Sequence, residues 1–130
     1  DQIPLVNEKI VAGAKFLAEF DKRVPIRGAF WLRKEDGRRW YLYVVTDQAD
    51  PADRRMAYEE VVAAAQVVRD PNLDMFQVRL IGRDEALARE VLHIVPPGSD
   101  PVPVRIFDRL MGEVSAAEVY IYPQPLPVVA

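Results

Sequence analysis

The stretch FWLRKEDGRRWYLYVV, residues 30–45, constrains the fold more than any other part of the chain. Two runs rich in aromatic and β-branched residues flank Asp36-Gly37, a dipeptide that accepts positive φ in a tight turn. The pattern therefore predicts a β-hairpin with strands over residues 26–34 and 39–46.

A two-residue turn at Asp36-Gly37 also determines which side chains share a face of the hairpin, since side chains alternate along a strand. One face receives Phe30, Leu32, Tyr41 and Tyr43, and the other receives Ala29, Trp31, Arg33, Trp40, Leu42 and Val44. Both faces are apolar, whereas a half-exposed sheet alternates apolar with polar residues. Either helices cover both faces or a second molecule covers one. Three helices could not easily cover both faces of a five-stranded sheet, so the pattern favours an oligomer or a partner at the hairpin.

Whether the hairpin faces belong to the core or to an interface depends on where the rings of the two tryptophans lie. A large ring left in water forfeits roughly 2 kcal/mol of burial free energy, so we expect at least one of Trp31 and Trp40 to be buried. In this register Arg33 stands across from Trp40. Its guanidinium is expected to stack on the indole while its charge stays in water.

The rest of the chain supplies three helical patterns and three further strands. Apolar residues at steps of three and four predict a helix over 4–22, and Asp50-Pro51 predicts a second helix over about 51–69. Asp84 is expected to cap a shorter helix over 85–94. The further strands are expected in MFQVRLIG (75–82), VPVRIF (102–107) and EVYIY (118–122), with a turn near Gly112 and one capped turn over 115–118.

This order of elements, helix-strand-strand-helix-strand-helix-strand-strand, favours one α+β domain over residues 1–123, built as a two-layer sandwich. Its five-stranded sheet should be mixed but mostly antiparallel, because hairpins force antiparallel neighbours while the strand-helix-strand stretch permits a parallel pair. Residues 124–130, QPLPVVA, are expected to form an extended tail.

Composition excludes several classes of protein. The chain has no cysteine, which excludes disulfides, thiolate zinc sites and cysteine nucleophiles and suits a reducing cytoplasm. We expect a soluble protein from its interspersed charges, and a cytoplasmic one from the absence of cysteine. No apolar stretch approaches the length of a membrane span and no leader pattern opens the sequence, but neither fact fixes the location. The sequence starts at Asp1 without a methionine, so a removed leader is not excluded.

Candidate catalytic and metal-binding residues are few. His93 is the only histidine and is expected to interact with a helix dipole rather than to catalyse. Asp47, Asp50 and Asp53 could offer oxygen ligands to a metal, but capping and loop solvation explain them better. The glycines do not group into a nucleotide-binding motif, so no cofactor is expected.

A resemblance emerges from FWLR…WYLYVVTD, followed by Asp50-Pro51, Ala57-Tyr58 and the late AEVYIYP. This combination resembles a family of small bacterial proteins with no assigned activity, from the first helix to Pro123. Its motifs are aromatic and structural. The resemblance implies a bacterial source but no activity, cofactor or site residue.

Two hypotheses of function follow from the aromatic hairpin. The first is a non-enzymatic interaction module, a homodimer or a binder of another protein, because aromatic residues and arginine are enriched in interface centres. The second is a binder of nucleic acid or a phosphate ligand, with rings stacking on bases and cations meeting phosphates. An enzyme is the third alternative. The candidate binding residues are Trp31, Arg33, Lys34, Arg38, Arg39, Trp40 and Tyr43.

Overall fold

The computed structural model describes residue 5, residues 7–96 and residues 102–123. These residues form, in order, α1 (Asn7–Asp21), β1 (Ile26–Lys34), β2 (Trp40–Thr46), α2 (Pro51–Val68), the 3₁₀ helix η1 (Met75–Gln77), β3 (Val78–Ile81), α3 (Ala86–Ile94), β4 (Val104–Met111) and β5 (Val114–Ile121). The predicted order of helices and strands is confirmed. The predicted tail, residues 124–130, lies outside the described residues.

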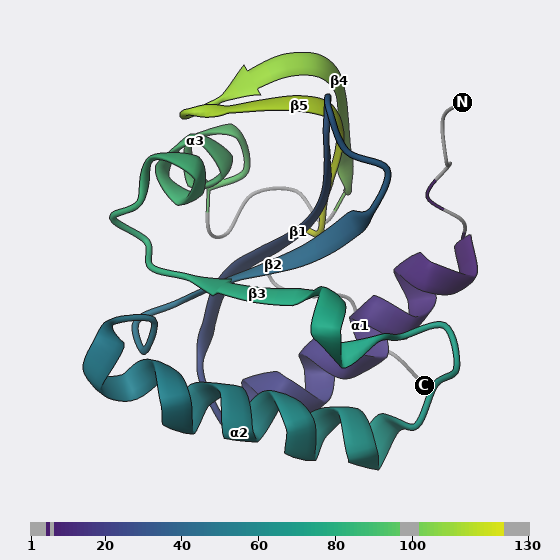
Figure 1. Ribbon diagram of the computed structural model, residues 1–130, viewed down its shortest axis with the longest axis vertical. Helices are drawn as coiled ribbons and strands as arrows, with labels where there is room; N and C mark the ends of the chain where they lie inside the picture. Colours follow the sequence, from purple (N-terminus) through teal and green to yellow (C-terminus); the bar gives the residue numbers. More distant parts are fainter. Residues whose placement is uncertain (1–4, 6, 97–101, 124–130) are drawn as a thin grey trace.

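The five strands form one sheet in the order β3-β2-β1-β5-β4 (Figure 1). β2 and β3 run parallel, and the other neighbours are antiparallel. The predicted α+β class with a mixed, mostly antiparallel sheet is therefore confirmed. The two edges of this sheet are β3 and β4, on opposite sides of the aromatic hairpin β1–β2.

Helices cover both faces of the sheet. α1 and α2 pack on one face, around Trp31, Trp40 and Leu42. α3 packs on the other face, around Phe30 and Leu32, where β4 and β5 bend over it (Figure 1). The predicted two-layer sandwich has helices on one face of the sheet, whereas here the sheet lies between α1 and α2 on one face and α3 on the other. This difference also removes the reason to expect a bare hairpin face, because each apolar face already has a helical cover.

The register of the hairpin is the predicted one, with Trp31 opposite Leu42 and Arg33 opposite Trp40. The turn itself was predicted wrongly. The amide of Gly37 donates to the Lys34 carbonyl at 3.0 Å, so Glu35 and Asp36 are the central residues of the turn, and Gly37 is not among the residues with positive φ. The β1–β2 ladder ends at Arg33–Trp40, and on the other side of β1 Lys34 pairs with Ala116 of β5.

A buried hydrogen-bond network ties α1 to the sheet. The Trp31 indole N–H donates to the Tyr122 hydroxyl at 2.9 Å, and that hydroxyl donates to the Ile10 carbonyl of α1 at 2.6 Å. Gly13 lies against both rings, and a Cβ there would overlap the Tyr122 hydroxyl. Only a glycine lets α1 approach this closely.

Several predicted boundaries need correction. Residues 75–77 form η1 instead of the start of a strand, because the Asp74 carboxylate accepts from the Phe76 amide and caps a 3₁₀ turn. Glu85 occupies the N-cap position of α3 that was assigned to Asp84, without a side-chain cap. Residues 115–118 belong to β5 and form no capped turn. Asp50 caps α2 as predicted, and Gly112 turns with φ of 61°.

Candidate functional site

The two tryptophans proposed as binding residues are core residues. Trp31 is fully buried and Trp40 is 2% exposed, both within the cluster covered by α1 and α2. The expectation that at least one is buried is confirmed. Their rings are not available to stack on a base or to contact a partner on this folded chain.

Arg33 is buried as well, which contradicts the expectation that its charge stays in water. It is 6% exposed, and its guanidinium lies 5.9 Å from the Trp40 ring. Nη1 donates to the Gly37 carbonyl at 3.3 Å, while Nε has no hydrogen-bond partner. Arg33 therefore stabilises the hairpin loop through its hydrogen bond to Gly37, and its buried guanidinium is not exposed for binding a ligand.

Tyr43 is half-buried on the opposite face, where its ring stacks on Phe30 at 5.2 Å between centroids. Burial raises the pKa of its phenol, and Arg79 opposes that rise. The neighbouring Tyr41 is covered by the Arg79 guanidinium at 4.5 Å. These rings serve packing between β2, β3 and the α3 face.

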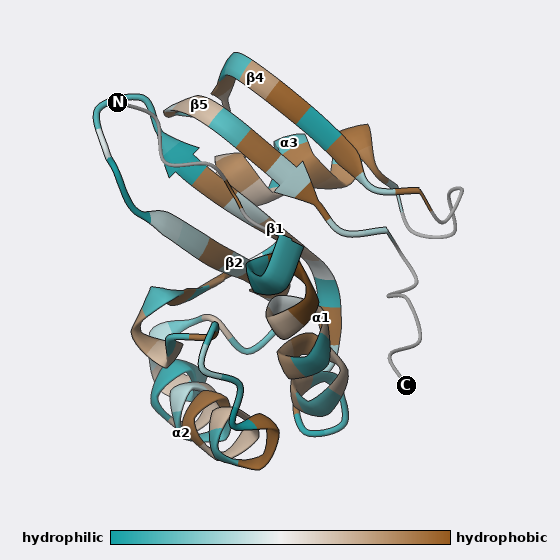
Figure 2. Cartoon of the chain, turned by 90° about the vertical axis from the view of Figure 1, so that its right-hand side faces the viewer, coloured by the Kyte–Doolittle hydropathy of each residue, from teal (hydrophilic) through white to brown (hydrophobic). Residues whose placement is uncertain are grey.

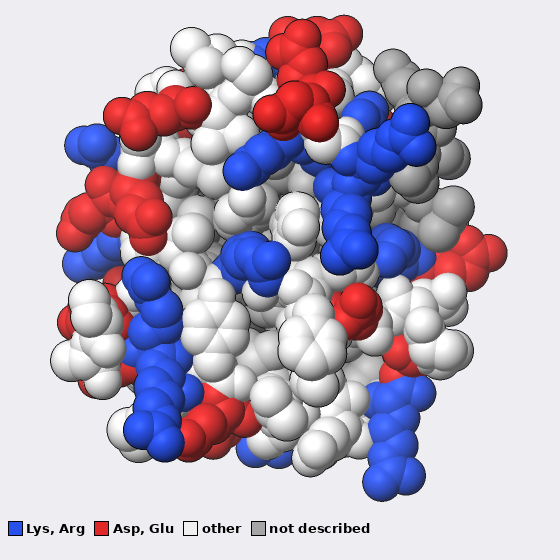
Figure 3. Space-filling model, viewed as in Figure 1, with Lys and Arg blue, Asp and Glu red and all other residues white. Residues whose placement is uncertain are grey.

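Lys34, Arg38 and Arg39 are the predicted binding residues that are exposed, and none of them forms an ion pair within the described part of the chain. Basic side chains gather near the end of the β1–β2 hairpin, beside acidic ones (Figure 3). The sequence therefore placed a basic loop correctly, but the structure separates its cations from the aromatic rings.

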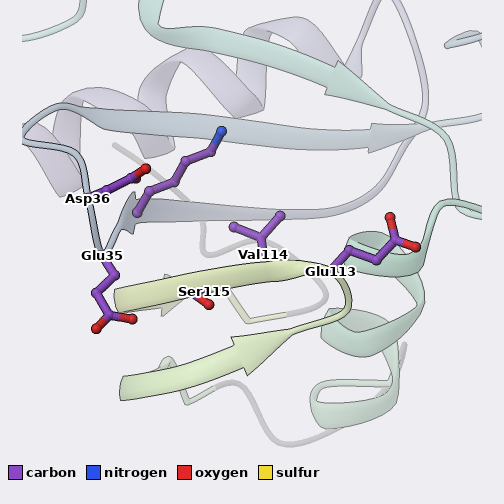
Figure 4. Close-up of a pocket in the computed structure, with 6 residues that line it drawn as sticks. Glu35, Asp36, Glu113, Val114 and Ser115 are labelled. Atoms are coloured by element: carbon purple, nitrogen blue, oxygen red, sulfur yellow. The ribbon is translucent and has the colours of Figure 1, made fainter.

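A shallow hollow lies between this loop and the β4–β5 turn. Lys34, Glu35 and Asp36 line it from the end of β1 and the loop, and Glu113, Val114 and Ser115 from the turn and the start of β5 (Figure 4). The carboxylates of Glu35 and Glu113 lie at opposite ends and point away from one another (Figure 4). Because these acids do not converge, the hollow offers neither a metal site nor a paired acid and base.

A second depression, of about 740 Å³, lies beyond the carboxyl ends of the parallel strands β2 and β3. α2 and α3 leave these strands toward opposite faces, and ligands bind at such switch points in open α/β sheets. Here the polar groups bind one another. Arg27 and Arg83 pair with Asp47 at 2.6 and 3.5 Å, and Arg54 donates to the Ala49 carbonyl.

Two of the three aspartates considered as metal ligands, Asp47 and Asp50, line the same depression. The hydrogen bond from Arg27 holds the pKa of Asp47 below its ordinary value, and Asp47 raises the pKa of Arg27 in return. The Asp50 carboxylate accepts from the Asp53 amide at 2.9 Å. The described residues contain no group of three acids or histidines arranged for a metal ion. His93 is exposed in the last turn of α3, where the helix dipole favours a cation.

Side chains of α2 and of β3 itself occupy the outer backbone groups of the β3 edge. The amide of Leu80, which points away from β2, donates to the Tyr58 hydroxyl at 3.0 Å. Arg79 donates to the carbonyls of Phe76 and Val78 at 2.7 and 3.2 Å. A second chain cannot add to this edge without breaking these hydrogen bonds.

The β4 edge is open by comparison. Within the described residues, no side chain hydrogen-bonds to the backbone of β4, and Phe107 and Leu110 are 60% and 61% exposed. Hydrophobic and hydrophilic segments alternate along this outermost strand (Figure 2). An open edge with large apolar side chains is a surface for pairing with another chain.

The sequence prediction missed this surface because it ended the strand at Phe107, before the polar pair Asp108-Arg109. The signal was present in Leu110-Met111 and Gly112. These residues continue the apolar pattern into a tight turn, and Met111 pairs with Val114 across it. Asp108 has φ of 50°, an irregularity that a regular strand pattern does not predict.

Comparisons of the chain with protein-family models, curated proteins and solved structures found no match. The resemblance to a bacterial family therefore stays a prediction. No helix in the described ranges has the length and apolar character needed to cross a membrane.

Proposed function

We propose that the protein is a non-enzymatic protein-interaction module whose binding surface is the outer edge of β4. The supporting observation is the exposure of Phe107 and Leu110 on an edge strand with an open backbone. Burying such a side chain contributes about 1.5 to 3 kcal/mol, and backbone hydrogen bonds along the edge would add orientation.

This proposal keeps the predicted class of function but moves its surface. The aromatic hairpin motivated the class, and its rings are core. At β4, by contrast, the apolar side chains are flanked by Arg105 and Arg109, which pair with Glu118 and Glu90 at 3.0 and 3.7 Å. An apolar centre with a charged rim is the usual anatomy of an interface.

Photo-crosslinking tests this proposal. A photoreactive phenylalanine analogue at position 107 should form covalent protein adducts when the cells that make the protein are illuminated. The matched control is the same analogue at Phe76, which is 74% exposed on η1, outside β4. Adducts at 107 that Leu110→Asp suppresses would support the module. Equal adducts at both positions, or none at 107 in a folded protein, would refute it.

A second candidate function is binding of nucleic acid or a phosphate ligand by Lys34, Arg38 and Arg39. Their exposure at one end of the molecule favours it, although the chain carries a net charge of −3. A labelled single-stranded oligonucleotide should then bind with affinity that falls steeply as salt rises. Equal binding by the wild type and a variant with all three residues changed to alanine would eliminate this candidate.

A further inference from the structure

We infer that the partner at the β4 edge is a second copy of this chain, paired antiparallel through β4 about a twofold axis between Asp108 and Arg109. This inference rests on the proposed function of the β4 edge. It commits to one register, in which Phe107 faces Leu110 of the second copy and Asp108 faces its Arg109.

The left-handed conformation of Asp108 makes this register consistent with the faces of the sheet. Ile106 and Met111 both pack toward α3. Because side chains alternate along a strand, their neighbours Phe107 and Leu110 then point to the opposite face. An ordinary strand would place residues 107 and 110 on different faces, so the irregularity at Asp108, where φ is 50°, brings the two exposed apolar side chains together.

Twofold symmetry doubles each contact of this register. A residue pair i and j that meets across the axis meets again as j and i, so the interface contains two Phe107–Leu110 contacts and two Asp108–Arg109 contacts. On the other face Ile106 stands across from Met111. Apolar pairs and opposite charges directly across neighbouring strands each stabilise a sheet.

Neighbouring registers lack this complementarity. A shift by one residue in one direction puts Phe107 across from Arg109, which points to the α3 face, where it pairs with Glu90. A shift in the other direction puts the two copies of Arg109 against each other across the axis. Like charges directly opposite are destabilising, and side chains of opposite faces cannot pack together.

The charge pattern also favours self-pairing over an unrelated strand. Arg105 is held by Glu118 at 3.0 Å, and its guanidinium lies 5.1 Å from the Tyr120 ring. Asp108 forms no ion pair among the described residues and is exposed at the edge. Arg109 of the second copy, which also pairs with Glu90 of its own chain at 3.7 Å, supplies the cation that Asp108 lacks, at the position where twofold symmetry requires it.

Charge reversal on purified protein tests the register. Asp108→Lys places two cations against each other on both sides of the axis, and Arg109→Asp places two carboxylates there. Each variant alone should sediment as a monomer at concentrations where the wild type dimerises. An equimolar mixture should restore a heterodimer. In that heterodimer the introduced lysine of one variant would face the introduced aspartate of the other, and the unchanged Arg109 of the first would face the unchanged Asp108 of the second.

Controls separate folding from pairing. Circular dichroism and thermal melting must show that both variants are folded, because residue 108 has positive φ. If lysine is not tolerated there, Asp108→Asn replaces Asp108→Lys. Asp108→Asn and Arg109→Asp, tested as separate variants, should then each weaken dimerisation. Phe107→Asp should abolish the wild-type dimer, and Phe76→Asp should leave it intact.

The outcomes distinguish the two proposals. Dimers of both charge variants that persist unchanged, or a mixture that stays monomeric while the wild type dimerises, would overturn the register. A wild type that is monomeric at every concentration, with crosslinks from position 107 to a different protein, would overturn self-pairing and leave the interaction module standing. Absence of any crosslink from position 107 in a folded protein would overturn both the interaction module and the self-pairing.

Discussion

Tyr122 is the residue at which the helix layer, the hairpin and the end of β5 meet. Its hydroxyl accepts from Trp31 and donates to Ile10, so both of its hydrogen-bonding roles are used inside the core. Burial raises the pKa of this phenol well above its ordinary range. The sequence predicted burial of a tryptophan here, but not this partner 91 positions away. The pairing depends on which strand becomes the neighbour of β1, and no local pattern encodes that choice.

Tyr122→Phe should lower the free energy of unfolding by about 1 to 3 kcal/mol at neutral pH, because the buried indole N–H loses its acceptor. Stability should also depend on pH through this group. Above roughly pH 10 the unfolded chain ionises while the folded phenol stays neutral, so wild-type stability falls as pH rises.

The variant should lose less stability than the wild type over that alkaline range. It should retain some loss, since burial also raises the pKa of Tyr43 and Tyr120. Urea unfolding at neutral pH and at several alkaline values checks both parts. An alkaline loss as large as that of the wild type would contradict the role assigned to Tyr122.

Gly13→Ala should destabilise the protein by about 1 to 3 kcal/mol, as overpacking of a rigid core does. Its Cβ would overlap the Tyr122 hydroxyl and lie 3.0 Å from Trp31 Nε1, and neither group is free to move because each is hydrogen-bonded. Gly82→Ala is the matched control, since its Cβ would meet neighbours at 3.7 and 3.8 Å. Thermal melting that showed equal effects for the two substitutions would contradict the close approach of α1.

At the scale of elements, the helices and strands themselves could be predicted from local sequence patterns, but the residues at which they begin and end could not. The hairpin register was predicted correctly although the turn lies one residue earlier than predicted, and α2 followed from Asp50 and Pro51. The turn at Gly37 and the extent of β4 did not follow from local patterns. The turn begins at Lys34, which pairs with Ala116 of β5 on the other side of β1, and β4 pairs with β5 beyond Asp108, as far as Met111. Of the seven candidate site residues, the exposed cations Lys34, Arg38 and Arg39 lie on the surface as a loop pattern suggests. Trp31, Arg33 and Trp40 are buried instead of lying on the surface, and the rings of Trp31 and Trp40 are covered by helices distant in sequence.

The two edge strands show why the candidate surface needed a structure. β3 is short, and its outer backbone groups are occupied by Tyr58, which lies on α2, and by Arg79 of β3 itself. β4 is twice as long, at 8 residues against 4, and no described side chain serves it in this way. Which edge is open is therefore a property of tertiary contacts, although both strands have β-forming sequences.

At the scale of the whole molecule, all large aromatic residues of the hairpin are used to hold one chain together, and the open edge at β4 is where a second chain can add. Pairing there would extend the five-stranded sheet across a twofold axis into one continuous sheet. The proposed interface would be one strand wide, which would place it among small interfaces and predicts a dimer that dissociates on dilution.

Hydrogen exchange of the unmodified protein over a range of concentrations tests the role of β4 most directly. Backbone amides of Val104–Met111 that are not bonded to β5 should exchange more slowly as concentration rises, because the second copy would protect them. Amides of Met75–Gln77, beside the exposed Phe76, should be unaffected. Protection that appeared at Met75–Gln77 instead, or exchange in β4 that was independent of concentration, would contradict the assignment of β4 as the surface on which this chain pairs.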